Sequence, residues 1–131
     1  MRLICATCRR PLTRECRQAS ADEYNPDAQD RQPAVPCGVI VRMNYRSTYT
    51  GPELAGGERG QFVSGAYFLN PADILENALK SSGVDNGCCG SDGCDGPNRS
   101  CTCGQVLGTQ WSDCWTSAEV RLETKAVLSV D

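Results

Sequence analysis

The sequence contains no histidine and few large apolar residues. Its 131 residues include only two tryptophans, two phenylalanines, four tyrosines and two methionines. Without histidine there is no Ser-His-Asp triad, no Cys-His nucleophile pair and no histidine-ligated metal site. No apolar run approaches the roughly 18–20 residues that cross a membrane, and the opening residues lack the apolar core of a secretion signal. We therefore expect a cytoplasmic protein that makes no membrane contact.

The charge balance is slightly acidic. The formal net charge is −3 and the calculated pI is about 4.9. A nucleic-acid-binding domain usually carries a basic surplus, so nucleic acid is not the expected partner. We expect an unidentified protein or small molecule instead.

The abundant feature is cysteine, with ten residues in the chain. In a reducing cytoplasm, clustered cysteines indicate metal binding more often than disulfides. Cys5 and Cys8 have the Cys-x-x-Cys spacing of a zinc knuckle, although a redox pair has the same spacing. Cys101 and Cys103, followed by Gly104, resemble a second, tighter knuckle. Together the two doublets predict one Zn²⁺ site made of four thiolates.

The remaining cysteines divide into two groups. A second zinc site is predicted from cysteines in or near a glycine-rich loop, namely Cys88, Cys89, Cys94 and Cys114. Whether the adjacent pair would ligate one ion, ligate two ions or act in redox chemistry stays open. Cys16 and Cys37 flank a polar segment and are interpreted as small packing residues.

The pattern of apolar residues predicts a mainly β (α+β) small zinc-binding domain that spans the whole chain, 1–131. Alternation of apolar and polar residues favours strands, over 38–49, 61–69, 105–111 and 117–123, with a short strand at Leu3 and Ile4. Three prolines and many polar residues predict an exposed, mobile loop over 18–36.

One helix is predicted, over about 71–81. Asn70 can cap its start, and Pro71 suits the first helical position. Apolar residues then form one stripe at helical spacing, namely Ile74, Leu75, Ala78 and Leu79. Residues 83–104 are rich in glycine, aspartate and cysteine, and are expected to form a loop.

Two resemblances add to this reading. The run GCCGSDGCDGPNRSCTCG (87–104), the later Asp113-Cys-Trp115 and the opening MRLICATC together resemble a family of small uncharacterised bacterial proteins, over roughly 1–8 and 67–122. More distantly, the Cys-x-x-Cys start and the late knuckle are similar to the zinc β-tent of Yippee-type domains. That similarity implies hairpins pinned by zinc and a sheet cleft for partners, although the Cys-x-Cys spacing departs from its pattern. A zinc-ribbon-like arrangement is the other expectation.

Three functions are compatible with these features. The favoured one is a binding module with structural zinc. The second is a thiol-redox or metal-handling protein that uses Cys88, Cys89 and Cys94. The third is a zinc enzyme, disfavoured because a closed thiolate-only site makes a poor Lewis acid, although Asp113 or Glu119 offers a general base.

Overall fold

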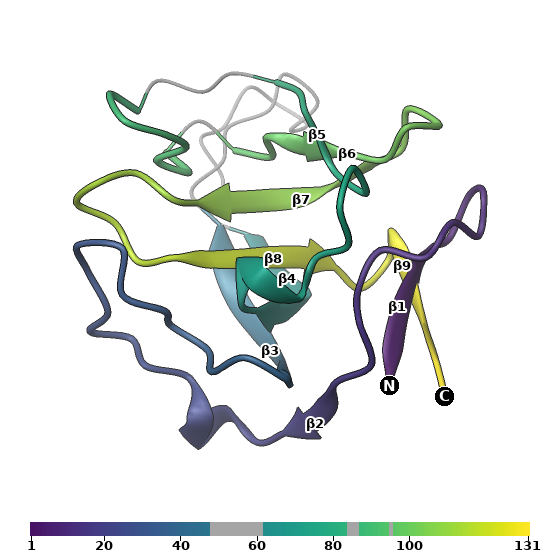
Figure 1. The fold of residues 1–131 in the computed structure, drawn as a ribbon, viewed down its shortest axis with the longest axis horizontal. Coiled ribbons are helices and arrows are strands. Elements are labelled where there is room, and N and C mark those ends of the chain that lie inside the picture. Colours follow the sequence, from purple (N-terminus) through teal and green to yellow (C-terminus); the bar gives the residue numbers. More distant parts are fainter. Residues whose placement is uncertain (48–61, 84–86, 95) are drawn as a thin grey trace.

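A computed structural model describes residues 1–47, 62–83, 87–94 and 96–131 (Figure 1). Almost all regular structure in these ranges is β-strand. The strands are β1 (Arg2–Cys5), β2 (Arg17–Ala19), β3 (Val39–Ser47), β4 (Phe62–Leu69), β5 (Lys80–Ser81), β6 (Arg99–Ser100), β7 (Val106–Trp111), β8 (Glu119–Glu123) and β9 (Val127–Val130). Two short 3₁₀ turns, η1 (Ala21–Glu23) and η3 (Pro71–Asp73), accompany them. The prediction of a mainly β chain is confirmed.

The strands form two sheets. Seven of them follow the order β2-β3-β4-β8-β7-β6-β5, in which only the β2–β3 pair is parallel. The other sheet is the antiparallel pair of β1 and β9, with Leu3 opposite Ser129. This pair brings the two ends of the chain side by side (Figure 1).

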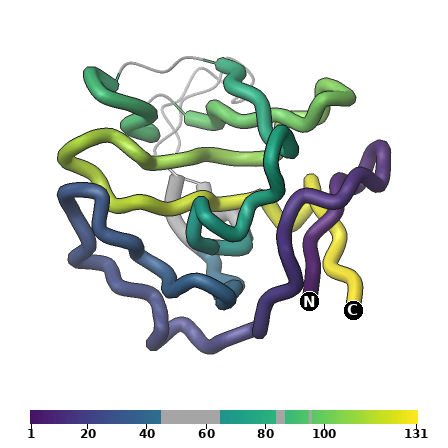
Figure 2. Tube along the Cα trace, in the orientation of Figure 1, coloured from purple at the N-terminus to yellow at the C-terminus, as the bar shows by residue number. Residues whose placement is uncertain are grey.

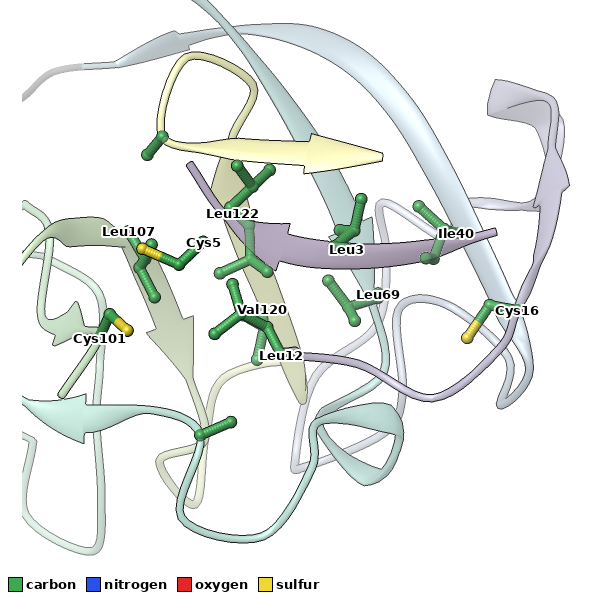
Figure 3. Close-up of a cluster of buried hydrophobic side chains, with 13 residues drawn as sticks. Leu3, Cys5, Leu12, Cys16, Ile40, Leu69, Cys101, Leu107, Val120 and Leu122 are labelled. Atoms are coloured by element: carbon green, nitrogen blue, oxygen red, sulfur yellow. The ribbon is translucent and has the colours of Figure 1, made fainter. Parts of the chain in front are cut away.

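Apolar residues are buried on both faces of the seven-stranded sheet. On one face Ile40, Leu69 and Val120 lie in register on β3, β4 and β8, each fully buried. They belong to the larger core cluster, which also holds residues of β1 and β9 (Figure 3). On the other face Val41 is paired with Phe68. Because both faces are covered, β3 buries consecutive residues rather than every second one.

The smaller cluster on the second face depends on one aromatic ring. Phe68 is 1% exposed, and Tyr24 packs edge-on against it with ring centroids 5.1 Å apart. The guanidinium carbon of Arg121 lies 4.6 Å from the same ring and 4.2 Å from the ring of Trp111. This stack connects the segment before β3 with β4, β7 and β8.

The helix predicted over 71–81 is wrong. The described residues contain no helix longer than a 3₁₀ turn, and this one ends at Asp73. Asn70 does cap it, because its side-chain oxygen accepts a hydrogen bond from the Ala72 amide. Beyond it the backbone bonds to another segment: Leu75 N–H donates to the Leu12 carbonyl at 2.9 Å, and Ile74 bridges Thr13. The chain then turns, with the Ala78 amide donating to the Leu75 carbonyl at 3.1 Å and Asn77 at φ 61°, so the apolar stripe reaches the core without forming a helix.

The strands predicted from the sequence agree with the structure better than the predicted loop and tail do. The four longer predicted strands match β3, β4, β7 and β8 within a few residues, and Leu3 and Ile4 lie in β1. The weakly patterned tail, 124–131, contains β9. The polar segment 18–36 includes part of β2 and all of η1, and it buries Ala34 and Val35.

Candidate metal centres

The first knuckle follows β1 directly. Ile4 bridges Pro11, and the Cys5 amide donates to the Arg10 carbonyl at 2.9 Å. The Arg9 amide in turn donates to the Cys5 carbonyl at 2.9 Å, and Arg9 itself has φ 67°. The chain thus folds back immediately after Cys8, so that Cys5 and Cys8 face the same space.

The second knuckle follows β6 and is one residue shorter. The Cys101 amide donates to the Gln105 carbonyl at 2.8 Å, and the Gly104 amide donates to the Cys101 carbonyl at 2.9 Å. Gly104 has φ 97°, a conformation that glycine adopts without strain. In both knuckles the left-handed residue directly follows the second cysteine. The Cys-x-Cys spacing is therefore a tighter version of the same turn.

The two turns meet on one side of the molecule (Figure 2). Cys5 Sγ lies 3.7 Å from Cys103 Sγ, and Cys8 Sγ lies 3.5 Å from Cys101 Sγ. All four sulfurs are within 4.8 Å of one another. Tetrahedral zinc with Zn–S bonds of about 2.3 Å requires sulfurs about 3.8 Å apart. We call this group, Cys5, Cys8, Cys101 and Cys103, the first cluster. The sequence predicted the same four residues.

Two of the four cysteines of the first cluster are buried and two are exposed. Cys5 and Cys101 are fully buried in the larger core cluster, beside Leu107 (Figure 3), whereas Cys8 and Cys103 are exposed. Polar side chains also join the two turns, since the Thr7 hydroxyl donates to Gln105 Oε1 at 2.6 Å. The cluster thus couples the β1–β9 pair to the edge of the large sheet.

Two thiols of the first cluster, Cys8 and Cys101, have pKa values shifted in opposite directions. Burial by itself would raise the pKa of Cys101, but hydrogen bonds from the Cys103 amide and from the neighbouring thiols lower it to about 7. For Cys8 a hydrogen bond from the Arg10 amide acts to lower the pKa, yet desolvation and the other three thiols raise it to about 11. Of these two thiols, buried Cys101 loses its proton at the lower pH.

A second group of thiols lies between the turn at 87–90 and the β7–β8 loop. Cys88 Sγ is 3.5 Å from Cys89 Sγ and 3.7 Å from Cys114 Sγ. The Ser112 amide donates to the Ser91 carbonyl at 2.7 Å and thereby holds the two segments together. A Cβ atom on Gly90 would lie 2.8 Å from the Ser112 carbonyl oxygen, so this close approach requires glycine.

Asp113 is the fourth member of this group. One of its carboxylate oxygens lies within 4.8 Å of all three sulfurs. Its Oδ1 accepts hydrogen bonds from the Cys89 amide at 2.9 Å and the Cys114 amide at 2.8 Å. Burial would raise the pKa of Asp113, but these two bonds lower it. We call Cys88, Cys89, Asp113 and Cys114 the second cluster.

The second cluster is more accessible than the first. Its three cysteines are exposed, whereas Asp113 is buried. Hydrogen bonding with Cys114 and Cys88 lowers the pKa of Cys89, and the nearby Arg31 acts in the same direction. The pKa of Cys114 is raised instead, to about 12, by hydrogen bonds to the two adjacent thiols.

The second predicted site differs from this cluster by one residue. Cys94 is not grouped with the other three cysteines; it is exposed, and its amide donates to Asp92 Oδ1 at 3.1 Å. From the sequence, Asp113 was interpreted only as a general base. Its position directly before Cys114 was the one sequence signal that could have placed it among the ligands. The sequence does not show that the turn at 87–90 and the β7–β8 loop meet.

Two further cysteines, Cys16 and Cys37, also belong to neither cluster. Cys16 is buried as expected, at the end of the core cluster opposite Cys5 and Cys101 (Figure 3). Cys37 was also expected to pack, but it is exposed, so that prediction is wrong. Trp115, which follows Cys114, is 55% exposed. No disulfide joins any of the ten cysteines, all of which the structure describes.

Comparison with protein-family models, curated proteins and solved structures gives no significant match. The two resemblances drawn from the sequence therefore stay predictions. Within the described ranges, none of the helical turns is long and apolar enough to cross a membrane. What the chain does show is two cysteine-rich clusters, each with four side chains placed where they can hold a metal ion.

Proposed function

We propose that this protein is a small cytoplasmic binding module whose fold is stabilised by zinc in the first cluster. The observation that carries the proposal is the placement of four sulfurs, from two turns far apart in the sequence, within 4.8 Å of one another. Four thiolates in tetrahedral geometry make a closed structural zinc site. The partner, a protein or a small molecule, would bind on the sheet or its loops.

The energetics support a structural role for the metal. Structural zinc contributes about 10–16 kcal/mol of apparent binding free energy that is coupled to folding. A typical domain has a total stability of only about 5–15 kcal/mol. Two members of the first cluster, Cys5 and Cys101, are part of the hydrophobic core. Without the ion, the four thiols are joined only by weak S–H···S contacts, so the metal-free fold loses much of its stability.

Zinc content and its removal test this proposal. We expect the purified protein to hold zinc, and a chelator to abolish the cooperative thermal transition and change the far-UV circular dichroism. Cys8→Ser and Cys103→Ser are the informative variants, because both residues are exposed and their replacement leaves the core intact. Cys37→Ser is the matched control, since it removes an exposed cysteine outside both clusters. An unchanged far-UV circular dichroism spectrum and an unchanged melting temperature after complete metal removal would contradict the proposal.

A second candidate function is thiol-redox or metal-handling chemistry at the second cluster, with Cys94 close by in the sequence. It is favoured by the exposure of Cys88, Cys89 and Cys114 and by their 3.5–3.7 Å sulfur contacts. Thiol titration of the native protein separates the two functions. Rapid and reversible oxidation of these thiols supports redox chemistry, whereas few reactive thiols and tightly held zinc support the binding module.

A further inference from the structure

One buried oxygen in the second cluster lacks a hydrogen-bond partner. Asp113 is 1% exposed, and among buried side-chain oxygens and nitrogens of the described residues its Oδ2 alone has no partner. Leaving a buried polar atom unsatisfied costs about 1–3 kcal/mol, and more for a charged group. Such an atom points to a partner that the polypeptide itself does not supply.

The other oxygen of the same carboxylate is fully engaged. Oδ1 accepts the amides of Cys89 and Cys114, at 2.9 and 2.8 Å, and Cys88 Sγ lies 3.8 Å from it. Two amide bonds occupy both of its lone pairs. They also fix the carboxylate in one orientation, as hydrogen bonds commonly do for carboxylates that ligate metals.

The amides that hold Asp113 belong to two of the three cysteines in the cluster. The same contacts therefore position the carboxylate and the sulfurs together. Three sulfurs and one carboxylate oxygen, all within 4.8 Å of one another, make a complete set of four donors. A cation among them would ligate this carboxylate, one oxygen of which has no hydrogen-bond partner in the protein.

We propose that Asp113 is the fourth ligand of a second zinc centre, together with Cys88, Cys89 and Cys114. The inference rests on the proposed function in that it takes zinc as the metal. It replaces Cys94, the fourth ligand expected from the sequence, by a carboxylate. Binding releases the thiol protons, because the ligands are thiolates.

The two centres then differ in how readily they exchange metal. The first has four sulfur ligands, two of them in the core, whereas the second has one oxygen ligand and three exposed cysteines. Thiolate is a softer ligand than a carboxylate oxygen, and soft ligands favour zinc. A chelator should therefore remove zinc from the second centre first, which gives it the character of an exchangeable store.

Asp113→Asn is the decisive variant. The asparagine oxygen can still accept the amides of Cys89 and Cys114, whereas its NH₂ group cannot ligate zinc. We expect zinc at the second centre to bind at least about tenfold more weakly in a chelator competition, with no change at the first centre. Asp92→Asn is the matched control, since Asp92 also accepts a backbone amide, that of Cys94, but lies outside both clusters.

The outcomes are distinct. Loss of the second zinc in Asp113→Asn and Cys114→Ser, with retention in Asp92→Asn and Cys94→Ser, supports the assignment. An effect of Cys94→Ser with none of Asp113→Asn overturns it. A chain that holds a single zinc, lost in Cys103→Ser, overturns it while the proposed function stands. A chain that holds no zinc overturns both.

X-ray absorption at the zinc edge of the unmodified protein provides a test without any variant. Two centres of the proposed composition average about three and a half sulfurs and half an oxygen per zinc, whereas two all-cysteine centres give four sulfurs. A fit with sulfur alone would refute the role of Asp113.

Discussion

Replacing Gly104 by alanine isolates the contribution of one backbone angle to the first cluster. Gly104 has φ 97°, and a Cβ atom added there would meet nothing within 4 Å. The substitution therefore causes no steric clash, and its cost is the strain of a left-handed L-residue, about 1–2 kcal/mol. This turn presents Cys101 and Cys103 to the metal. The strain is relieved when the turn opens, so the substitution favours release of zinc from the first cluster.

Two measurements follow from this magnitude. In the zinc-loaded protein, thermal unfolding of Gly104→Ala should shift downward by about 3 to 10 °C. Release of zinc from the first cluster to a chelator should accelerate by up to about thirtyfold, the factor that corresponds to about 2 kcal/mol.

Gly38→Ala is the matched control. Gly38 has φ 82°, and it also has nothing within 4 Å of an added Cβ atom, but it belongs to neither knuckle. Its melting temperature should fall by a similar amount while zinc release keeps the wild-type rate. If Gly38→Ala accelerates zinc release as much as Gly104→Ala, release passes through global unfolding and the argument from local strain is refuted. A Gly104→Ala protein identical to wild type would refute it as well.

Two further predictions concern titratable groups outside the clusters. Burial raises the pKa of the Cys16 thiol, and the negative charge of Asp73 adds to the effect; iodoacetamide should therefore modify exposed Cys37 in the native protein and spare Cys16 until unfolding, as mass spectrometry of peptides can show. Burial also raises the pKa of Tyr24 above 10, with Glu119 acting in the same direction. Because the folded-state value exceeds the unfolded one, this stabilisation is present below about pH 10 and is lost as the pH rises. From about pH 9 to pH 11 the free energy of unfolding should thus fall more in wild type than in Tyr24→Phe, and equal falls would contradict the assignment.

The first cluster could be predicted from sequence because its geometry is local. Each doublet specifies its own turn, and the glycine after Cys103 marks where the chain reverses. With no histidine in the chain, a thiolate zinc site needs two such doublets. The two doublets could therefore be paired without knowing how the residues between them fold.

The errors arose where tertiary contacts decide the outcome. The stripe formed by Ile74, Leu75, Ala78 and Leu79 suits a helix. Instead the Leu12 carbonyl accepts the Leu75 amide, and the chain turns after Leu75 with Asn77 at φ 61°. β9 was missed because Leu128 is exposed and the alternation along the strand is weak. Asp113 was placed in the wrong role because its partners, the amides of Cys89 and Cys114, come together only when two loops meet.

The separation of the first cluster along the chain has a consequence for biosynthesis. Cys5 and Cys103 are 98 positions apart, which a ribosome covers in about 5 to 20 seconds. During that interval Cys5 and Cys8 have been made without Cys101 and Cys103. Strand β1 bonds to the segment that follows it, but its strand partner β9 has not yet been made. Strand β1 and the first knuckle thus complete their native contacts only after nearly all of this region has been synthesised. Until Cys101 and Cys103 follow, Cys5 and Cys8 can offer a metal ion only two of the four thiolates of the first cluster.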